Sequence, residues 1–93
     1  MLNKLFQIVK DRKENPRDGS YTNQLLEGGY QRIAQKLGEE AVEVIIAAGK
    51  QGRQRVIEES ADLLYHLLVL LVNQEVDLKE VEAELESRHL GSK

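Results

Sequence analysis

The feature that most constrains the fold is an apolar run from Leu63 to Val72, which only His66 interrupts. The run belongs to a segment of about residues 53–74 that we predict to be helical, and apolar residues occupy nearly every face of it. A helix of this kind has to be buried on every face. Since the run is far shorter than the roughly 20 residues that cross a membrane, other helices must cover it.

The first part of the chain also has helical periodicity. Apolar residues recur three or four positions apart in residues 2–9, which is typical of an amphipathic helix. This helix should end before Pro16, because the residue before a proline avoids helical geometry. Ser20 or Thr22 is placed to cap a short helix that runs through Glu27.

The rest of the chain completes an all-α fold. We predict a long helix of about residues 29–48, which the glycines of residues 49–52 separate from the apolar helix. A last helix, residues 78–89, begins after Asp77 as its N-cap, and Glu80 completes a capping box. No segment alternates apolar and polar residues as a strand does. The sequence therefore predicts one all-α domain over all 93 residues, with two long central helices and shorter flanking ones.

A chain of this size has limited means to cover a helix that is apolar all round, because small domains bury a smaller share of their surface. Two long antiparallel helices could meet the same pair in a second copy and form a four-helix bundle about a two-fold axis. We therefore expect at least a homodimer. The alternative is a monomeric bundle in which the first and last helices cover the core.

Charge and composition exclude several functional classes. The chain has 13 Lys and Arg against 16 Asp and Glu, a net charge of −3, which does not favour nucleic-acid binding. Hydrophobic residues make up 41%, too many for a disordered protein. There is no cysteine, so a metal site would use carboxylates or the two histidines. The N-terminus lacks the pattern of a signal peptide, and we expect a soluble, cytoplasmic protein without membrane contact.

Acidic residues gather at matching places in the two long helices. The first group contains Glu39, Glu40 and Glu43, and the second contains Glu58, Glu59 and Asp62. Acids three or four residues apart share a helical face and repel one another by about 0.2–0.5 kcal/mol per pair when exposed. Both groups adjoin apolar stretches, where the repulsion is stronger. The repulsion lowers stability, so the position of these acids indicates that they serve a function.

An antiparallel hairpin would bring the two groups together. Glu43 lies about two turns before the glycine break and Glu59 about two turns after it. Glu40 and Glu43 would then lie level with Glu59 and Asp62, and such a cluster needs a cation. Carboxylates without cysteine suit Mg²⁺ or Mn²⁺, and Mg²⁺ commonly binds carboxylates together with substrate phosphates. The pattern thus predicts a site for a metal–phosphate complex.

The alternative interpretation of these acids is a solvated helix face held by salt bridges. Glutamate is a good helix former. Lys36 could pair with Glu40, and Arg55 with Glu59, at the favourable i, i+4 spacing. The mirrored arrangement of two acid pairs about a glycine turn favours the metal site.

The acidic motif resembles the EExxE…ExxD signature of the MazG-like nucleoside-triphosphate pyrophosphohydrolases, an all-α superfamily. Three further stretches narrow the resemblance: the Gly-Ser-Tyr-Thr turn of residues 19–22, KxGEEAxE at residues 36–43, and DLLYHLLVLL at residues 62–71. Together they are similar to the phosphoribosyl-ATP pyrophosphohydrolases of histidine biosynthesis, over residues 2–90. Some relatives carry a cyclohydrolase domain in front, for which this sequence has no room, so it resembles the free-standing form.

The resemblance implies hydrolysis of phosphoribosyl-ATP to phosphoribosyl-AMP and pyrophosphate, with Mg²⁺. Hydrolysis at the α–β phosphate linkage requires neutralisation of the leaving pyrophosphate by metal ions, and carboxylates that orient or deprotonate a water. Such a step needs no protein nucleophile. Glu39 is the candidate for orienting the water or supporting the ligands, and which acid is the base stays open. The candidate metal ligands are Glu40, Glu43, Glu59 and Asp62.

Candidate substrate-binding residues lie in three places. Lys36, one turn before Glu40, could reach a phosphate oxygen or form a helix salt bridge. Ser20, Tyr21 and Thr22 could offer hydroxyls and N–H groups to an anion, or simply cap a helix. A basic group near the end of the first helix could hold the ribose 5-phosphate or be solvated. This basic group consists of Arg12, Lys13 and Arg17.

One further hypothesis concerns His66, and two others concern alternative functions of the protein. His66 lies one turn beyond Asp62 and could support the ligands, or be a structural histidine of the apolar helix. A house-cleaning pyrophosphohydrolase for other nucleotides would use the same metal site with another base pocket. A helical dimer that only binds a partner would need no acidic site at all.

Overall fold

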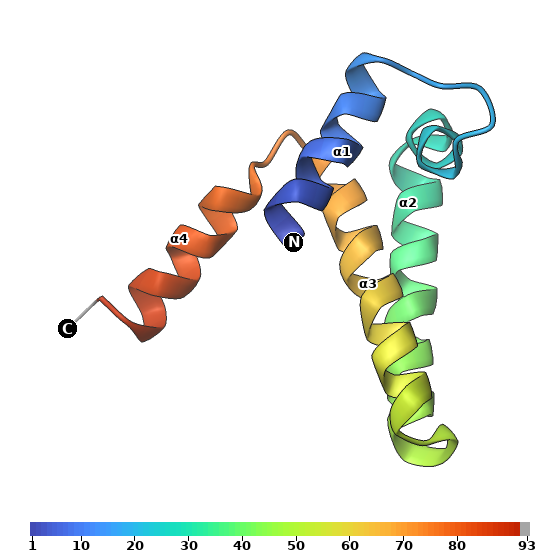
Figure 1. The fold of residues 1–93 in the computed structure, drawn as a ribbon, viewed down its shortest axis with the longest axis vertical. Helices are drawn as coiled ribbons and strands as arrows, with labels where there is room; N and C mark the ends of the chain where they lie inside the picture. The colour runs from blue at the N-terminus through green and yellow to red at the C-terminus, as the bar shows by residue number, and fades with distance from the viewer. Residues whose placement is uncertain (92–93) are drawn as a thin grey trace.

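The structure is a computed structural model that describes residues 1–91, and within this range it contains α-helices and no strand. The all-α prediction is thereby confirmed. None of the helices in residues 1–91 has the length and apolar character that crossing a membrane requires. In chain order the elements are α1 (Leu2–Glu14), α2 (Tyr21–Ile46), the π-helical turn η1 (Ala47–Gln51), α3 (Arg53–Asn73) and α4 (Leu78–His89) (Figure 1).

The helix boundaries in the first half follow the predicted signals. α1 ends at Glu14, two residues before Pro16. The hydroxyl of Ser20 caps α2 by accepting the backbone N–H of Asn23 at 3.2 Å. The predicted short and long helices form one continuous element, but the backbone leaves helical geometry at Gly29, with φ 75° and ψ −173°. Glycine accepts this positive φ readily, so it marks the kink between the two parts.

α2, η1 and α3 form the predicted antiparallel hairpin (Figure 1). α2 and α3 have the most extensive contact between elements in the described chain, and α1 packs mainly on α3. The chain does not break at Gly49 as we expected. It continues as a wider π-helical turn to Gln51 and reverses at Gly52, whose φ of 88° again favours glycine.

The hydrophobic core lies where α1 covers the hairpin, beside the half of α3 that is distant from η1 (Figure 1). α3 is not buried on every face within one chain, because Leu64 is 42% and Leu67 37% exposed. The expected complete burial of this helix is therefore not reached by a single copy. The buried core residues are Phe6, Val9, Leu25, Ile33, Leu68, Val69, Val72 and Leu78.

α4 extends away from the other helices, with which it has only sparse contact (Figure 1). Its start is well defined. The Asp77 carboxylate accepts the N–H of Lys79 at 2.9 Å, and the Glu80 carboxylate accepts the N–H of Asp77 at 3.0 Å. The predicted capping box is thus confirmed.

Candidate active site

Three acidic side chains from the two helices of the hairpin meet at one place. Glu40 of α2 and Glu59 and Asp62 of α3 each offer a carboxylate oxygen, and these oxygens all lie within 4.8 Å of one another. Glu59 is buried, Glu40 is half-buried and Asp62 is exposed, so the group opens to solvent on one side. The hairpin therefore brings carboxylates of the two predicted groups level with each other.

These carboxylates disturb each other's charge. Burial raises the pKa of Glu40 above its ordinary value, and the contact with Glu59 and the charge of Asp62 raise this pKa further. Mutual repulsion of this kind is relieved when a cation binds between the carboxylates. Three oxygen donors at this spacing fit a hard divalent cation, which prefers carboxylate ligands. The residues present are thus suited to hold a metal ion.

Arg55 supplies a positive charge at the edge of this group. Its Nη2 lies 2.5 Å from Oε2 of Glu59, and its Nη1 lies 2.5 Å from Oε1 of Glu58. The hydrogen bond to Glu58 and the charge of Glu59 raise the pKa of Arg55. The pairing of Arg55 with Glu59 that the sequence allowed is therefore present, alongside the carboxylate group rather than in place of it.

Two other acids of the predicted set lie outside this group. Glu43, half-buried one turn beyond Glu40, has no oxygen in it. Glu39 is exposed and accepts a hydrogen bond from Gln35 at 3.0 Å. Lys36 pairs with Glu39 at 3.4 Å, rather than with Glu40 as the spacing suggested. The hydrogen bonds from Gln35 and Lys36 lower the pKa of Glu39.

The buried ring of His66 connects the start of α2 to Asp62. Its Nδ1 lies 2.8 Å from the backbone carbonyl oxygen of Asp62. Because a carbonyl oxygen can only accept, Nδ1 carries the hydrogen, and Nε2 accepts a hydrogen bond from the hydroxyl of Tyr21 at 3.0 Å. Both ring nitrogens of this 5% exposed side chain are thereby satisfied.

A second contact joins the same two helices. The hydroxyls of Thr22 and Tyr65 are hydrogen-bonded, and burial raises the pKa of Tyr65. The rings of Tyr21 and Tyr65 are stacked, with centroids 6.2 Å apart. The hydroxyls of Ser20, Tyr21 and Thr22 thus all have partners within the chain. Sequence reasoning did not foresee the contact of Tyr65, because no periodicity relates residues of distant segments.

The basic residues before α2 are held mainly through their backbone. Buried Asn23 accepts the N–H of Arg17 at 2.9 Å and donates to the carbonyl oxygen of Arg12 at 2.8 Å. The Arg12 side chain pairs with Asp11, 3.0 Å away, and Lys13 pairs with Glu75. A hollow of about 140 Å³ lies beside this loop. Sequence reasoning missed Asn23, although its place three residues after the N-cap was a usable signal.

Comparisons with known proteins point to one family. The profile of a family described as phosphoribosyl-ATP pyrophosphohydrolase matches residues 2–89. A phosphoribosyl-ATP pyrophosphatase of Listeria welshimeri serovar 6b is 54% identical over 88 residues, which are 95% of this chain and 84% of the relative. A protein of the same name from Clostridium botulinum is 46% identical over 88 residues, 95% of this chain and 80% of the relative.

The similarity also extends to a larger protein. The histidine biosynthesis bifunctional protein HisIE of Caldanaerobacter subterraneus subsp. tengcongensis is 47% identical over 89 residues. These residues are 96% of this chain and 43% of that protein. With the family profile covering almost the whole chain and relatives about half identical, the chain belongs to the phosphoribosyl-ATP pyrophosphohydrolase family.

Proposed function

We propose that this chain is a phosphoribosyl-ATP diphosphatase, which hydrolyses phosphoribosyl-ATP to phosphoribosyl-AMP and pyrophosphate in histidine biosynthesis. The observation that carries the proposal is the carboxylate group of Glu40, Glu59 and Asp62 in a member of this family. The relatives are named for the same substrate. Because phosphoribosyl-ATP is a highly charged metabolite, we propose that the reaction takes place in the cytoplasm. We also propose that the chain carries it out as a single domain.

The same carboxylates are the metal ligands we propose, for Mg²⁺ or Mn²⁺. Glu43 is a fourth candidate, because one helical turn separates it from Glu40 on the same helix. When bound, the ion would neutralise the charge that develops on the leaving pyrophosphate. Without an ion, the three carboxylates would repel the phosphates of the substrate, so the ion is also needed for binding.

The chain's own side chains would orient the other reactants. Carboxylate oxygens that do not ligate the ion would accept hydrogen bonds from a water and hold it in line with the α phosphorus. Lys36 lies one turn before Glu40 and pairs with Glu39, which gives Glu39 a supporting role. The ammonium group of Lys36 is a donor for phosphate oxygens. For the ribose 5-phosphate we propose the loop before α2, with Arg12, Lys13, Arg17, Ser20, Tyr21 and Thr22.

We further propose that the enzyme is a homodimer. Large apolar side chains of the hairpin are exposed in the single chain, and water contact with such a surface is unfavourable. A second hairpin would cover Val42, Leu64 and Leu67 and complete a four-helix core. The exposed apolar residues of the hairpin are Val42, Ile45, Ile46, Ile57, Leu64 and Leu67.

Pyrophosphate release by the purified protein tests the function. We expect turnover of phosphoribosyl-ATP with Mg²⁺, and a loss of roughly a hundredfold or more in Glu40→Gln and Asp62→Asn. Glu86→Gln, an exposed change of the same chemistry on α4, should leave turnover unchanged. Preferred hydrolysis of deoxynucleoside triphosphates would contradict the substrate. Full activity in both acid variants would contradict the site.

A further inference from the structure

The connection between α3 and α4 is a well-defined elbow. The N–H of Glu75 donates to the carbonyl oxygen of Val72 at 3.1 Å, and that of Val76 to Leu71 at 3.0 Å. These two bonds form a Schellman motif, with Glu75 in the left-handed conformation at φ 59°. The capping box at Asp77 then starts α4 at once. Because both helix ends are hydrogen-bonded, the elbow fixes the direction in which α4 leaves the body.

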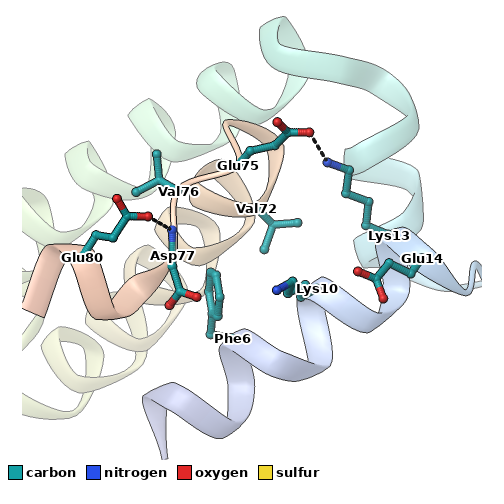
Figure 2. A pocket seen from close by; sticks show the side chains of 9 residues that line it. All are labelled: Phe6, Lys10, Lys13, Glu14, Val72, Glu75, Val76, Asp77 and Glu80. Carbon is teal, nitrogen blue, oxygen red and sulfur yellow. Dashed lines mark hydrogen bonds and ion pairs between the residues drawn. The ribbon is translucent and has the colours of Figure 1, made fainter.

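That direction leads away from the chain's own core. A hollow of about 300 Å³ separates α1 from the elbow and the start of α4, with Phe6 and Val72 among its lining (Figure 2). The ion pair between Lys13 and Glu75 crosses its rim at 3.6 Å (Figure 2). Beyond the elbow, contact of α4 with the body consists mainly of buried Leu78 and a long hydrogen bond from Asn3 to Glu82.

α4 nevertheless has an apolar face. Leu78, Val81 and Leu85 lie three and four residues apart and form one stripe along it. Leu85 is 53% exposed in the single chain. An isolated helix of 12 residues is marginal in water, because helix nucleation is costly and few hydrogen bonds follow. The helix therefore needs a surface to pack on, and its own chain buries only Leu78 at its start.

The radius of gyration of the chain is larger than that of a compact chain, which agrees with packing against a second copy. The radius of gyration of the chain is 14.7 Å. A compact chain of this length has a radius of gyration of about 12 Å. Both the α4 arm at one side of the body and the long hairpin extend the chain (Figure 1).

The turn end of the hairpin is complementary to α4. Ile45 and Ile46 lie at the end of α2 and Ile57 lies near the start of α3, and all three are exposed. They offer apolar surface of the kind that the stripe requires. The turn end carries Lys50 and Arg53, while the neighbouring Arg55 is already paired with Glu58 and Glu59. Residues 78–89 contain four glutamates against one lysine and one arginine. An acidic amphipathic helix and a basic apolar surface thus occur in the same chain, at opposite ends of α3.

We propose that α4 is an exchanged arm. Leu78 stays in the core of its own chain. The Val81 and Leu85 part of the stripe packs on the apolar turn end of the hairpin in the second copy, with the glutamates of α4 facing Lys50 and Arg53. Two-fold symmetry makes this contact twice, and antiparallel hairpins place the turn end of one copy near the elbow of the other. The inference rests on the homodimer proposed above and specifies what holds it together.

Cross-linking between copies tests the arm directly, because the chain has no cysteine of its own. One preparation carries Leu85→Cys and the other Ile45→Cys, with tags of different mass, and the mixture is treated with a short bifunctional maleimide. We expect a mixed cross-linked pair. The matched control replaces Leu85→Cys by Ala83→Cys, which lies about 200° around the helix from Leu85. A mixed pair no more abundant than in this control overturns the proposal.

Association measurements provide the second test. Sedimentation equilibrium should show that Leu85→Glu weakens the dimer by roughly tenfold or more, since a charge replaces a buried leucine at two symmetric places. Ala83→Glu adds the same charge on the outer face and should leave association unchanged. A wild-type dimer that Leu85→Glu does not weaken overturns the arm and leaves the dimer standing. A wild-type monomer overturns both, while pyrophosphate release reports the proposed activity separately.

Discussion

The hydroxyl of Tyr21 donates a hydrogen bond to Nε2 of His66, 3.0 Å away, while Nδ1 of the same ring donates to the carbonyl oxygen of Asp62. One ring therefore ties the first turn of α2 to the backbone of an acidic residue of the candidate site.

Tyr21→Phe should weaken this link without changing the apolar packing of the ring. We expect a loss of about 1 kcal/mol in the free energy of unfolding, because a buried nitrogen loses its donor. Turnover should fall several-fold if the link positions Asp62. Tyr30→Phe is the matched control, since Tyr30 is 58% exposed. Denaturant unfolding and pyrophosphate release measure the two effects, and equal behaviour of both variants would refute the link.

The raised pKa of Glu40 has a consequence for the metal-free protein. Folding favours the protonated carboxyl, because burial and the neighbouring Glu59 and Asp62 disfavour its charge. The folded state thus holds more protons than the unfolded state at pH values just above the ordinary pKa of 4.5. The free energy of unfolding should therefore fall as the pH rises through the raised pKa.

Glu40→Gln should remove this fall, since an amide does not titrate. The free energy of unfolding is measured against pH for both proteins in the presence of a chelator, and the difference between the two curves gives the contribution of Glu40. Glu39 and Glu58 do not interfere, because their pKa values are lowered and they affect stability below pH 4.5. Parallel curves for the two proteins above pH 4.5 would show that folding does not raise the pKa of Glu40. Adding Mg²⁺ at neutral pH should stabilise the wild type more than the variant.

Arg55 should tune the affinity of the acidic group for a cation. Its guanidinium lies 2.5 Å from Glu59, so Arg55→Gln removes a positive charge next to a proposed ligand. We expect Mg²⁺ to bind about two- to fivefold more tightly, as judged by calorimetric titration. Arg53→Gln serves as the control, because Arg53 has no ion pair within residues 1–91. Equal affinities in the two variants would show that Arg55 does not influence the group.

The sequence predicted what depends on local signals. Pro16, Ser20 and the Asp77 capping box mark helix ends, because caps act within one turn. The mirrored spacing about the turn brought Glu40 level with Glu59 and Asp62, because helical rise is regular. The side-chain directions of Glu39 and Glu43 were beyond such reasoning. They depend on competing partners, as the pairing of Lys36 with Glu39 illustrates.

Contacts between distant segments could not be predicted from the sequence either. Nothing in the local pattern indicates that Thr22 meets Tyr65, or that Asn23 holds the backbone of Arg12 and Arg17. We expected complete burial of α3 from its composition, but a single chain does not provide it. Leu64 and Leu67 are exposed, and the proposed dimer would cover them.

Asn23→Ala tests how the loop before α2 is held. The buried amide makes two hydrogen bonds to this backbone, and its loss leaves the N–H of Arg17 and the carbonyl of Arg12 without these partners. We expect a loss of about 2–3 kcal/mol in the free energy of unfolding. Asn15→Ala, which removes an exposed hydrogen bond to Asp11, should cost much less. A raised KM of Asn23→Ala, with little change in kcat, would indicate that the loop binds substrate.

The elbow residue Glu75 adopts a left-handed conformation that glycine normally occupies in this motif. Glu75→Gly should raise the free energy of unfolding by about 0.5–1 kcal/mol, because relief of the backbone strain exceeds the entropy that glycine adds to the unfolded chain. The ion pair to Lys13 that is lost is exposed and contributes little. Gln74→Gly, at φ −90°, adds the same entropy without relief and should destabilise. Denaturant unfolding at one protein concentration compares them, and a stability loss in both variants would show that Glu75 is not strained.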